Sequence, residues 1–512
     1  MRLWTAVLLS LALVIGLVGL AAPAPVSNAQ AQPTPTATPT DPGLPPAPSE
    51  GKRTTPEQID TGKQWKASNC QTPTTAPATQ GVVPLSVTAT GVCFNAGFTV
   101  WSAGERTYAL LTGGYQAAFV VLDVTDPAHP TVLTTYLWRD DQGNPTPTQH
   151  TYTQDAKHFT QGDRHFVSLN HEAFGNTNGF CGIAIVEVTD PAHPQFITRV
   201  NDRNSPRGAW CDVHNTFVEP DAAGQGAWLY LTADEPDDLR VLDIRNLQNI
   251  VEVGQYKEPG STYIHDITVV NGRVYVSYWE AGLVILDAAS LKPGVQPAPL
   301  NPFGSIKPAG FRVHHALPTP DGRYVFIQDE ITSGLNFQAV RMVDIRDLGQ
   351  PREVAALGMP YRQAHNLLVE NNRLYVGWYE SGLQGWDIDT TDPAAPKLTQ
   401  AVQHTLRSTF TGGFHGAWGV AKLPCQVAVF TRTCLYLGDI EMGLDIVALQ
   451  DPAYATADLN QDGQVNIVDL SHVAARWGTR RGDADYYAIF DLNGDGVVNV
   501  VDLQAVARQW TG

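Results

Sequence analysis

Residues 119–130 read FVVLDVTDPAHP, and residues 183–194 read IAIVEVTDPAHP. In both stretches an apolar run ends at an acidic residue and continues into a proline-rich turn, a pattern typical of a buried strand followed by a tight turn. Equivalent apolar runs recur along the chain at Phe119–Asp123, Ile183–Glu187, Leu239–Asp243, Leu283–Asp287, Val340–Asp344, Leu383–Asp387 and Leu444–Ala448. Self-similarity of this kind indicates a repeat architecture.

The repeat has a period of about 54 residues, because six intervals span the 325 residues between Asp123 and Ala448. A second strand precedes each apolar run, as in RVYVSY at 273–278, and each unit holds about four short strands. A four-stranded unit of this length predicts a propeller blade. We therefore expect an all-β propeller of about seven blades over residues 63–450, since a pair of β-sandwiches would not give a fixed period.

The repeated phrases, with GLVILDAAS at 282–290, resemble those of the LVIVD-repeat propeller family. The resemblance spans most of residues 100–450. It implies a propeller fold and a secreted or cell-surface protein with one of several interchangeable anchors. It implies no settled activity, because propellers include binding proteins and enzymes.

The composition agrees with a turn-rich β protein, since the 512 residues include 45 glycines and 36 prolines. Lysine and arginine total 33 against 51 acidic residues, which gives a net charge of −18. Binding to nucleic acid or to an anionic membrane needs a concentrated basic surface. The charge balance therefore argues against both, and we expect no nucleic-acid partner.

The N-terminal region predicts export. A basic start and the apolar run at 8–22 precede small residues, so residues 1–31 read as a signal peptide. The alternative is an uncleaved membrane anchor, which would be the chain's only membrane contact. Residues 32–62 form a Pro/Thr-rich linker. We expect a secreted or extracellular protein that can be attached to a cell surface.

Six cysteines are consistent with disulfides in an oxidising compartment, although six cysteines allow 15 pairings. Proximity in sequence favours the pairs Cys70–Cys93, Cys181–Cys211 and Cys425–Cys434.

Polar residues recur in register with the blades. A histidine opens the first strand of five successive units, with spacings of 51, 50, 50 and 50 residues: His214, His265, His315, His365 and His415. His314 doubles the third of them. An acidic residue closes the second strand of six units: Glu172, Glu235, Glu280, Glu330, Glu380 and Glu441. Because adjacent strands of a blade are antiparallel, these two ends emerge on one face, at the mouth of the channel.

Three interpretations of this channel mouth remain open, and its candidate residues are the five histidines with Glu280 and Glu380. Imidazole and carboxylate groups together suit a transition metal or zinc, and they also suit acid–base catalysis. Each histidine could instead be a structural staple between blades. The mouth could also bind a polar ligand.

Residues 458–469 read DLNQDGQVNIVD, and residues 491–502 read DLNGDGVVNVVD. Both fit the calcium loop of an EF-hand, except that Asp replaces the final Glu. In the first loop we expect Ca²⁺ ligands from Asp458, Asn460, Asp462, the Gln464 carbonyl, Asn466 and Asp469. In the second loop we expect them from Asp491, Asn493, Asp495, the Val497 carbonyl, Asn499 and Asp502.

Each loop runs into a short expected helix, at 470–477 and 503–510, and the loops start 33 residues apart. This arrangement resembles a type I dockerin over residues 455–512. The resemblance implies two bound Ca²⁺ ions, docking to a cohesin-type domain, and frequent association with polysaccharide-degrading enzymes. Dockerins often carry Ser and Thr at the tenth and eleventh loop places, whereas this chain carries Ile467-Val468 and Val500-Val501. These apolar pairs belong either to a core or to a hydrophobic docking face.

The sequence favours a secreted, non-catalytic propeller that binds a protein or glycan and is anchored through a calcium-dependent dockerin–cohesin contact. The complex would be extracellular or on a cell surface, with a connection to polysaccharide breakdown. The alternative is a metal-dependent hydrolase or oxidoreductase with its site at the channel mouth, where the histidines and glutamates would bind a transition metal.

Overall fold

The computed structural model describes residues 78–92, 95–114, 118–138, 151–173, 180–201, 210–234, 236–261, 263–293, 298–331, 334, 336–359, 362–405 and 415–512. The expected signal peptide and linker, Cys70, Cys93 and Glu235 lie outside these residues. The chain divides into two compact units, and the boundary between them falls between Leu449 and Gln450. Within the described part of the chain, no helix is both long and apolar enough to span a membrane.

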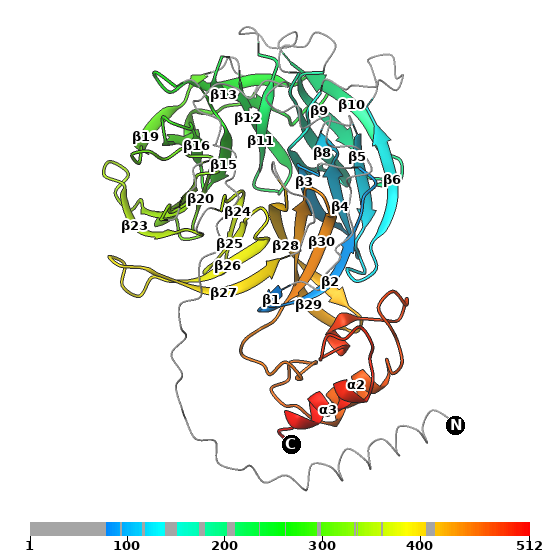
Figure 1. The fold of residues 1–512 in the computed structure, drawn as a ribbon. Helices are drawn as coiled ribbons and strands as arrows, with labels where there is room; N and C mark the ends of the chain where they lie inside the picture. The colour runs from blue at the N-terminus through cyan, green and yellow to red at the C-terminus, as the bar shows by residue number, and fades with distance from the viewer. Residues whose placement is uncertain are drawn as a thin grey trace. The chain divides into compact units, whose positions relative to one another are not determined.

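The described residues of the larger unit form seven antiparallel blades (Figure 1). Blades one and two consist of β3 (Phe98–Ala103), β4 (Arg106–Thr112), β5 (Ala118–Asp123) and β6 (Thr131–Leu137), and of β7 (Ala156–Gln161), β8 (Arg164–His171), β9 (Gly182–Glu187) and β10 (Gln195–Val200). Blade three consists of β11 (Val213–Pro220), β12 (Gly226–Ala233), β13 (Asp238–Asp243) and β14 (Val251–Tyr256), with β18 (Ala298–Pro299) at its edge. Blade four consists of β15 (Asp266–Val270), β16 (Arg273–Ser277), β17 (Leu283–Asp287) and β19 (Asn301–Ile306).

Blade five consists of β20 (His315–Pro318), β21 (Tyr324–Gln328), β22 (Val340–Asp344) and β23 (Arg352–Leu357). Blade six consists of β24 (Leu367–Glu370), β25 (Arg373–Gly377), β26 (Leu383–Asp389) and β27 (Lys397–Thr405), with β1 (Ala78–Gln80) at its edge. Blade seven consists of β28 (Ala417–Val427), β29 (Phe430–Asp439), β30 (Gly443–Leu449) and β2 (Val82–Thr88). The prediction of an all-β propeller of about seven blades is confirmed.

In four blades the aspartate at the end of the apolar run fixes the turn that follows it. The side chain of Asp123 accepts a hydrogen bond from the Thr125 backbone N–H at 2.9 Å, and Asp287 accepts one from Ala289 at 2.8 Å. A short carboxylate that bonds the backbone two residues later holds the chain in a turn. In blade four this turn continues into the 3₁₀-helix η5 (Ala288–Ser290). The repeated acidic residue is therefore explained by a structural role.

Every blade carries a register shift between its third and fourth strands, for example between Ile285 and Leu286 in β17. A bulge of this kind bends the sheet and increases its right-handed twist. The third strands are buried almost throughout, as in LVILD of β17, whereas the fourth strands are partly exposed. The first strands of neighbouring blades contact one another, so they line the centre of the ring.

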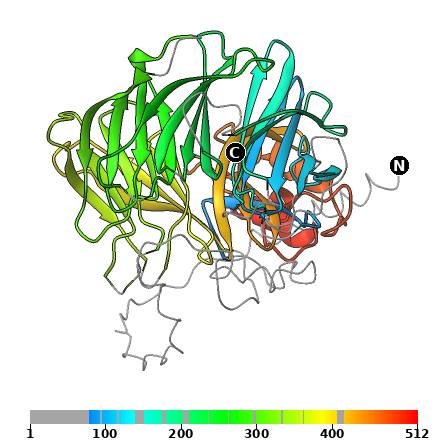
Figure 2. The same cartoon turned by 90° about the horizontal axis from the view of Figure 1, so that it is seen from above.

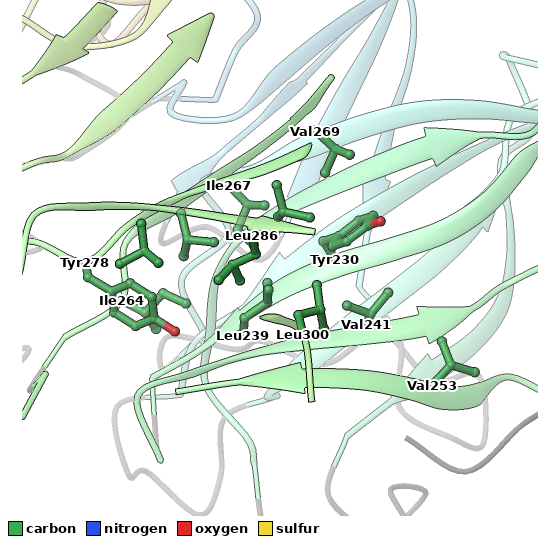
Figure 3. Packing of buried hydrophobic residues seen from close by; sticks show 13 residues of the cluster. Tyr230, Leu239, Val241, Val253, Ile264, Ile267, Val269, Tyr278, Leu286 and Leu300 are labelled. Atoms are coloured by element: carbon green, nitrogen blue, oxygen red, sulfur yellow. The ribbon is translucent and has the colours of Figure 1, made fainter. Parts of the chain in front are cut away.

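The core consists of apolar layers between neighbouring blades. Figure 3 shows the layer between blades three and four, where Tyr230, Leu239 and Val241 of blade three face Ile267 and Leu286 of blade four. Each of these side chains is almost fully buried. Burying a side chain of this size stabilises the folded state by about 1.5–3 kcal/mol, so these layers hold the blades together.

The ring closes in blade seven, where the N-terminal strand β2 completes a sheet made from three C-terminal strands. Val82 pairs with Leu449, and Thr88 pairs with Leu444, in antiparallel register. Figure 2 shows the blades after a 90° rotation. Disulfides join Cys181 to Cys211 and Cys425 to Cys434. Two of the three favoured pairings are thus present, and the third lies outside the described residues.

The C-terminal unit, labelled by α2 (Ile467–Ala474) and α3 (Val500–Arg508) in Figure 1, contains two similar helices. The 3₁₀-helix η6 (Ala488–Phe490) lies between them in sequence. Both α-helices start three residues earlier than expected, because Asn466 and Asn499 act as N-caps inside the loops. Each cap side chain accepts a hydrogen bond from the backbone two residues later, at 2.8 Å.

Candidate functional site

The starts of the first strands in blades three to six bring four histidine rings side by side: His214, His265, His314 and His365. We call these four residues the imidazole row. Successive ring centroids are 4.3, 3.9 and 4.5 Å apart. The backbone N–H groups of His265, His314 and His365 each donate to the second strand of their own blade, at 2.7–2.8 Å. These three residues therefore occupy equivalent positions in successive blades.

Two members of the imidazole row are fixed by the neighbouring blade. The Nδ1 of His265 lies 3.0 Å from the backbone oxygen of His314, and the Nδ1 of His365 lies 2.7 Å from that of Trp418. A carbonyl oxygen can only accept, so both Nδ1 atoms carry the hydrogen and donate. In the neutral ring, the Nε2 atom then carries the lone pair. These Nδ1 contacts are staples between blades, whereas the Nε2 atoms face the rest of the row.

Carboxylates lie at both ends of the row. Glu172 Oε1 lies 2.9 Å from His214 Nδ1, and Glu172 and Asp234 form a compact group with His214. Near the other end, the Glu330 oxygens lie 3.4 Å from His314 Nε2 and 3.7 Å from His365 Nε2. The Tyr379 hydroxyl donates a hydrogen bond to Glu330.

Burial controls the charge of these groups. It lowers the pKa of His365 to about 3 and lowers the pKa values of His265 and His314 well below the ordinary value, with the neighbouring rings adding to the effect for the latter two. Burial raises the pKa of Glu330 to about 7, opposed by the hydrogen bond from Tyr379. Burial also raises the pKa of Asp234 well above its usual range, and nearby Glu172 adds to this shift. The imidazoles are therefore neutral at pH 7.

The structure brings together His214, His265 and His365 of the five repeated histidines. His315 lies elsewhere, because the residue whose backbone bonds the second strand of blade five is His314. The ring of His315 lies between blades, where its Nδ1 accepts from the Leu367 N–H at 3.1 Å. Burial lowers the pKa of His315 to about 3. His415 is half-buried and interacts electrostatically with Asp439 of blade seven.

The two predicted mouth glutamates pair with arginines instead of with the imidazole row. Glu280 lies 3.1 Å from the Arg312 guanidinium, and Glu380 forms an ion pair with Arg362. The carboxylates beside the row are Glu172, Asp234 and Glu330. The repeated pattern included Glu172 and Glu330, but Asp234 and Tyr379 carry no spacing signal that distinguishes them from core residues.

In the C-terminal unit, the two candidate calcium loops adopt the same conformation. Asp458 accepts a hydrogen bond from the Gly463 N–H at 2.9 Å, and Asp491 accepts one from the Gly496 N–H at 2.7 Å. Gly463 and Gly496 have φ values of +88° and +86°, a region that favours glycine. The side chain at the first loop place is thus held by the turn at the sixth place, as an EF-hand loop requires.

The last acidic residue of each loop is buried and turned back into the loop. Asp469 accepts from the backbone N–H groups of Leu459 at 2.8 Å and Asn466 at 2.9 Å, and Asp502 is held in the same way by Asn493 and Asn499. The Asp502 pKa is raised by burial, with a further contribution from the charge of Asp491. The loop carboxylates therefore repel one another.

The donor set of both loops fits Ca²⁺. Each loop gathers carboxylate, amide and carbonyl oxygens, which are the hard ligands that Ca²⁺ prefers. Four loop carboxylates (Asp458, Asp469, Asp491 and Asp502) are buried, and none lies in an ion pair with a basic residue that the structure describes. The sequence did not predict one contact of the second loop, in which the Tyr486 hydroxyl donates to Asp491 at 2.7 Å. The first loop has no equivalent of this contact, because the corresponding residue is Ala453.

The apolar pairs at the tenth and eleventh loop places are solvent-exposed. The exposed fractions are 50% for Ile467, 42% for Val468, 37% for Val500 and 38% for Val501. They lie at the starts of α2 and α3, whereas Leu470, Val473, Leu503 and Val506 supply the core. The sequence left two interpretations of these pairs, a place in the core or a hydrophobic docking face. Their exposure excludes the core of this unit.

Comparisons with known families agree with both modules. Residues 456–510 match the sequence model of the Dockerin type I domain, and residues 114–137, which contain β5 and β6, match that of the LVIVD repeat. The chain therefore carries a type I dockerin domain, a calcium-binding module found in extracellular cellulosome proteins, together with an LVIVD-repeat propeller. Both predicted resemblances are confirmed. The chain has no match among curated proteins.

Solved structures share only a low overall similarity with this chain. The periplasmic gluconolactonase PpgL of Pseudomonas aeruginosa is 15% identical over 67% of this chain and 95% of that one, with a TM-score of 0.44. A chain of a mitotic checkpoint complex is 10% identical over 74% and 96%, with a TM-score of 0.43. Chaetomium thermophilum Raptor is 13% identical over 73% and 30%, with a TM-score of 0.45. At these values the similarity carries no information about activity.

Proposed function

We propose that this protein is a secreted binding protein whose dockerin docks, in a calcium-dependent manner, to a cohesin-type domain of an extracellular or cell-surface complex. The propeller then binds a protein or glycan within that complex, in connection with polysaccharide breakdown. The observation that carries the proposal is the pair of matching oxygen-lined loops, each followed by a helix with an exposed apolar pair at its start.

The docking face that we assign consists of Ile467, Val468, Val500 and Val501. Apolar side chains that are exposed at equivalent places of two repeated helices in a small module mark an interaction surface. Because both helices start within their calcium loops, the position of this docking face depends on the bound ions. Loss of Ca²⁺ would therefore remove the docking face as well as the fold of the loops.

The propeller offers a separate surface for its own ligand. A hollow of about 350 Å³ lies between blades three and four, where the lining residues include Trp228, Asn271, Asp287 and Phe303. The Phe303 ring is 43% exposed. An exposed aromatic ring beside polar groups suits a sugar or an extended peptide. The hollow lies at the opposite end of β15 from the imidazole row, since Asn271 follows this strand and His265 precedes it.

A cohesin-binding measurement tests the docking proposal. Full-length protein is titrated by calorimetry against a panel of type I cohesin domains, in 2 mM Ca²⁺ and in excess chelator. We expect binding in calcium only. The double variant Val468→Asp/Val501→Asp should weaken binding at least about a hundredfold, since burying one such side chain contributes about 1.5–3 kcal/mol.

The control is Val429→Asp, which places the same charge on an exposed propeller valine and should leave binding unchanged. Cohesin affinity that is insensitive both to chelation and to the double variant would contradict the proposal.

A further inference from the structure

We propose that the imidazole row binds one divalent transition-metal ion where a ring nitrogen of His265, a ring nitrogen of His314 and a carboxylate oxygen of Glu330 all lie within 4.8 Å of one another. The proposal is independent of the dockerin. His214 and His365 lie on either side of these ligands in the row, and the carboxylate of Glu172 orients the His214 ring through Nδ1.

The spacing of the rings fits a common metal ion. A metal–nitrogen bond of about 2.0–2.1 Å places neighbouring imidazole centroids roughly 4.5 Å apart when two rings are at right angles around the ion. The successive centroids lie 4.3, 3.9 and 4.5 Å apart. The His214 and His265 Nε2 atoms are 2.9 Å apart, which is close to the ligand–ligand separation of roughly 3 Å in the same geometry.

The hydrogen bonds of the row determine which ring nitrogen of each histidine is free to bind a metal. His265 and His365 donate from Nδ1 to backbone oxygens, which leaves the lone pair on Nε2. In protein metal sites the second ring nitrogen of a ligating histidine donates to a carbonyl or a carboxylate in this way. Glu172 makes the corresponding contact with Nδ1 of His214. The staple and the metal interpretations therefore use different nitrogens of the same rings and are compatible.

His314 supplies the observation that stapling does not explain. Its side chain is 1% exposed, yet neither ring nitrogen has a hydrogen-bond partner in the described structure. A buried polar group without a hydrogen-bond partner destabilises the folded state. The Glu330 oxygen lies 3.4 Å from the His314 Nε2, which is too distant for a strong hydrogen bond. The same distance is suitable for two atoms that bind one metal ion. A metal ion would satisfy the ring.

The aromatic residues around the row are held in an unfavourable backbone conformation. Trp279 and Tyr379 have φ values of +44° and +38°, which non-glycine residues rarely adopt. The Trp279 ring stacks on His265 at 5.1 Å, and Tyr379 packs edge-on against His365 at 5.3 Å. Backbone strain of this kind concentrates at functional sites. The rings exclude water from the row, and the side chain of His214, which is 13% exposed, gives the ion an approach.

The chemical class of the ion follows from the ligands. Imidazole nitrogens suit Zn²⁺, Cu²⁺, Fe²⁺ and Ni²⁺, whereas Ca²⁺ and Mg²⁺ prefer oxygen. The row and the dockerin loops are therefore expected to select different ions in the same chain.

The test uses full-length protein without a polyhistidine tag, stripped of metal and then kept in 2 mM Ca²⁺ so that the dockerin loops are occupied. Zn²⁺ uptake is measured by equilibrium dialysis, and Cu²⁺-loaded protein is examined by electron paramagnetic resonance. We expect one Zn²⁺ per chain and nitrogen hyperfine splitting from several imidazoles. His314→Gln should weaken Zn²⁺ binding at least tenfold, because it removes a ligand and no staple.

His193→Gln is the matched control, since it removes an exposed imidazole that contacts only Asp190 at 2.9 Å, and it should bind like the unmodified protein. The proposal is overturned if the unmodified protein takes up no Zn²⁺, or if the Cu²⁺ spectrum shows no nitrogen ligands. It is also overturned if folded His314→Gln protein, checked by circular dichroism, keeps the original affinity. The copper spectrum decides the question even if the variant does not fold.

Discussion

The two dockerin loops predict how steeply calcium stabilises the C-terminal unit. A ligand that binds only the folded state adds about 1.4 kcal/mol to the free energy of unfolding for every tenfold rise in its concentration above the dissociation constant, for each site. Two loops with the same geometry therefore predict a slope of about 2.7 kcal/mol per tenfold rise in free Ca²⁺. The slope of unfolding free energy against the logarithm of free Ca²⁺ concentration therefore gives the number of calcium sites, and their dissociation constants need not be known.

Asp469→Asn should halve this slope. Asp469 is buried and receives two backbone N–H groups, at 2.8 and 2.9 Å, while it also closes the first loop. The amide keeps one acceptor oxygen but loses the second acceptor and the negative charge. We expect a slope of about 1.4 kcal/mol per tenfold rise, and a loss of about 0.5–2 kcal/mol at every calcium concentration from the damaged helix cap.

The assay is urea denaturation of a 450–512 fragment, followed by helical circular dichroism at several free Ca²⁺ concentrations. This fragment carries both α-helices of the described chain and belongs to a separate compact unit. Asp485→Asn is the matched control, because this exposed carboxylate makes only a distant contact with Arg476 at 3.5 Å. A slope near zero in the unmodified fragment, or an unchanged slope in Asp469→Asn, would refute the calcium assignment of the first loop.

Two further predictions concern the propeller. Burial raises the pKa of Asp439 to about 6 from an ordinary 3.8, so the folded state holds the extra proton between these values. The stability that this proton contributes is present below pH 3.8 and is lost as the pH rises through 6. The free-energy advantage of Asp439→Asn should therefore grow by roughly 2–3 kcal/mol between pH 3.5 and 7.5 in urea unfolding, and a pH-independent difference would contradict it. Removing the Cys181–Cys211 disulfide, with a sequence separation of 30, should destabilise the propeller about 1 kcal/mol more than removing Cys425–Cys434, with a separation of 9; equal losses would count against chain entropy as the cause.

The sequence predicted best those features that depend on contiguous residues. The calcium loops place all their expected ligands within twelve residues, so the spacing was enough to predict the turn between the first and sixth loop places. The blades were also predictable, because six of the seven apolar runs end in an acidic residue, and Asp123, Asp243, Asp287 and Asp344 each close their own turn. The bulge in each blade had no such signal, since it depends on pairing between strands.

The imidazole row was predicted only in part, because it depends on contacts between blades. A spacing of 50 residues selects His315, yet the backbone hydrogen bond to Gln328 places His314 in the row. A difference of one residue in the length of one unit is enough to change which ring enters the row. Likewise, Glu280 occupies the expected strand end, but its carboxylate forms an ion pair with Arg312, which precedes the first strand of the next blade. Competing partners of this kind are visible only in three dimensions.

The closure of the ring determines how the protein would respond to tension between its two ends. Val82 lies opposite Leu449, so the chain enters and leaves blade seven at the same end of one antiparallel pair. A force that pulls these ends apart loads one residue pair at a time and peels β2 away from β30, in the way a zipper opens. In the described part of the chain, the three residues of β1, paired with β27, precede this seam. The Cys425–Cys434 bond joins β28 to β29, and among the described residues no disulfide joins β2 to β30. A propeller tethered at both termini would therefore lose β1 from the edge of blade six first and then open along the β2–β30 seam of blade seven.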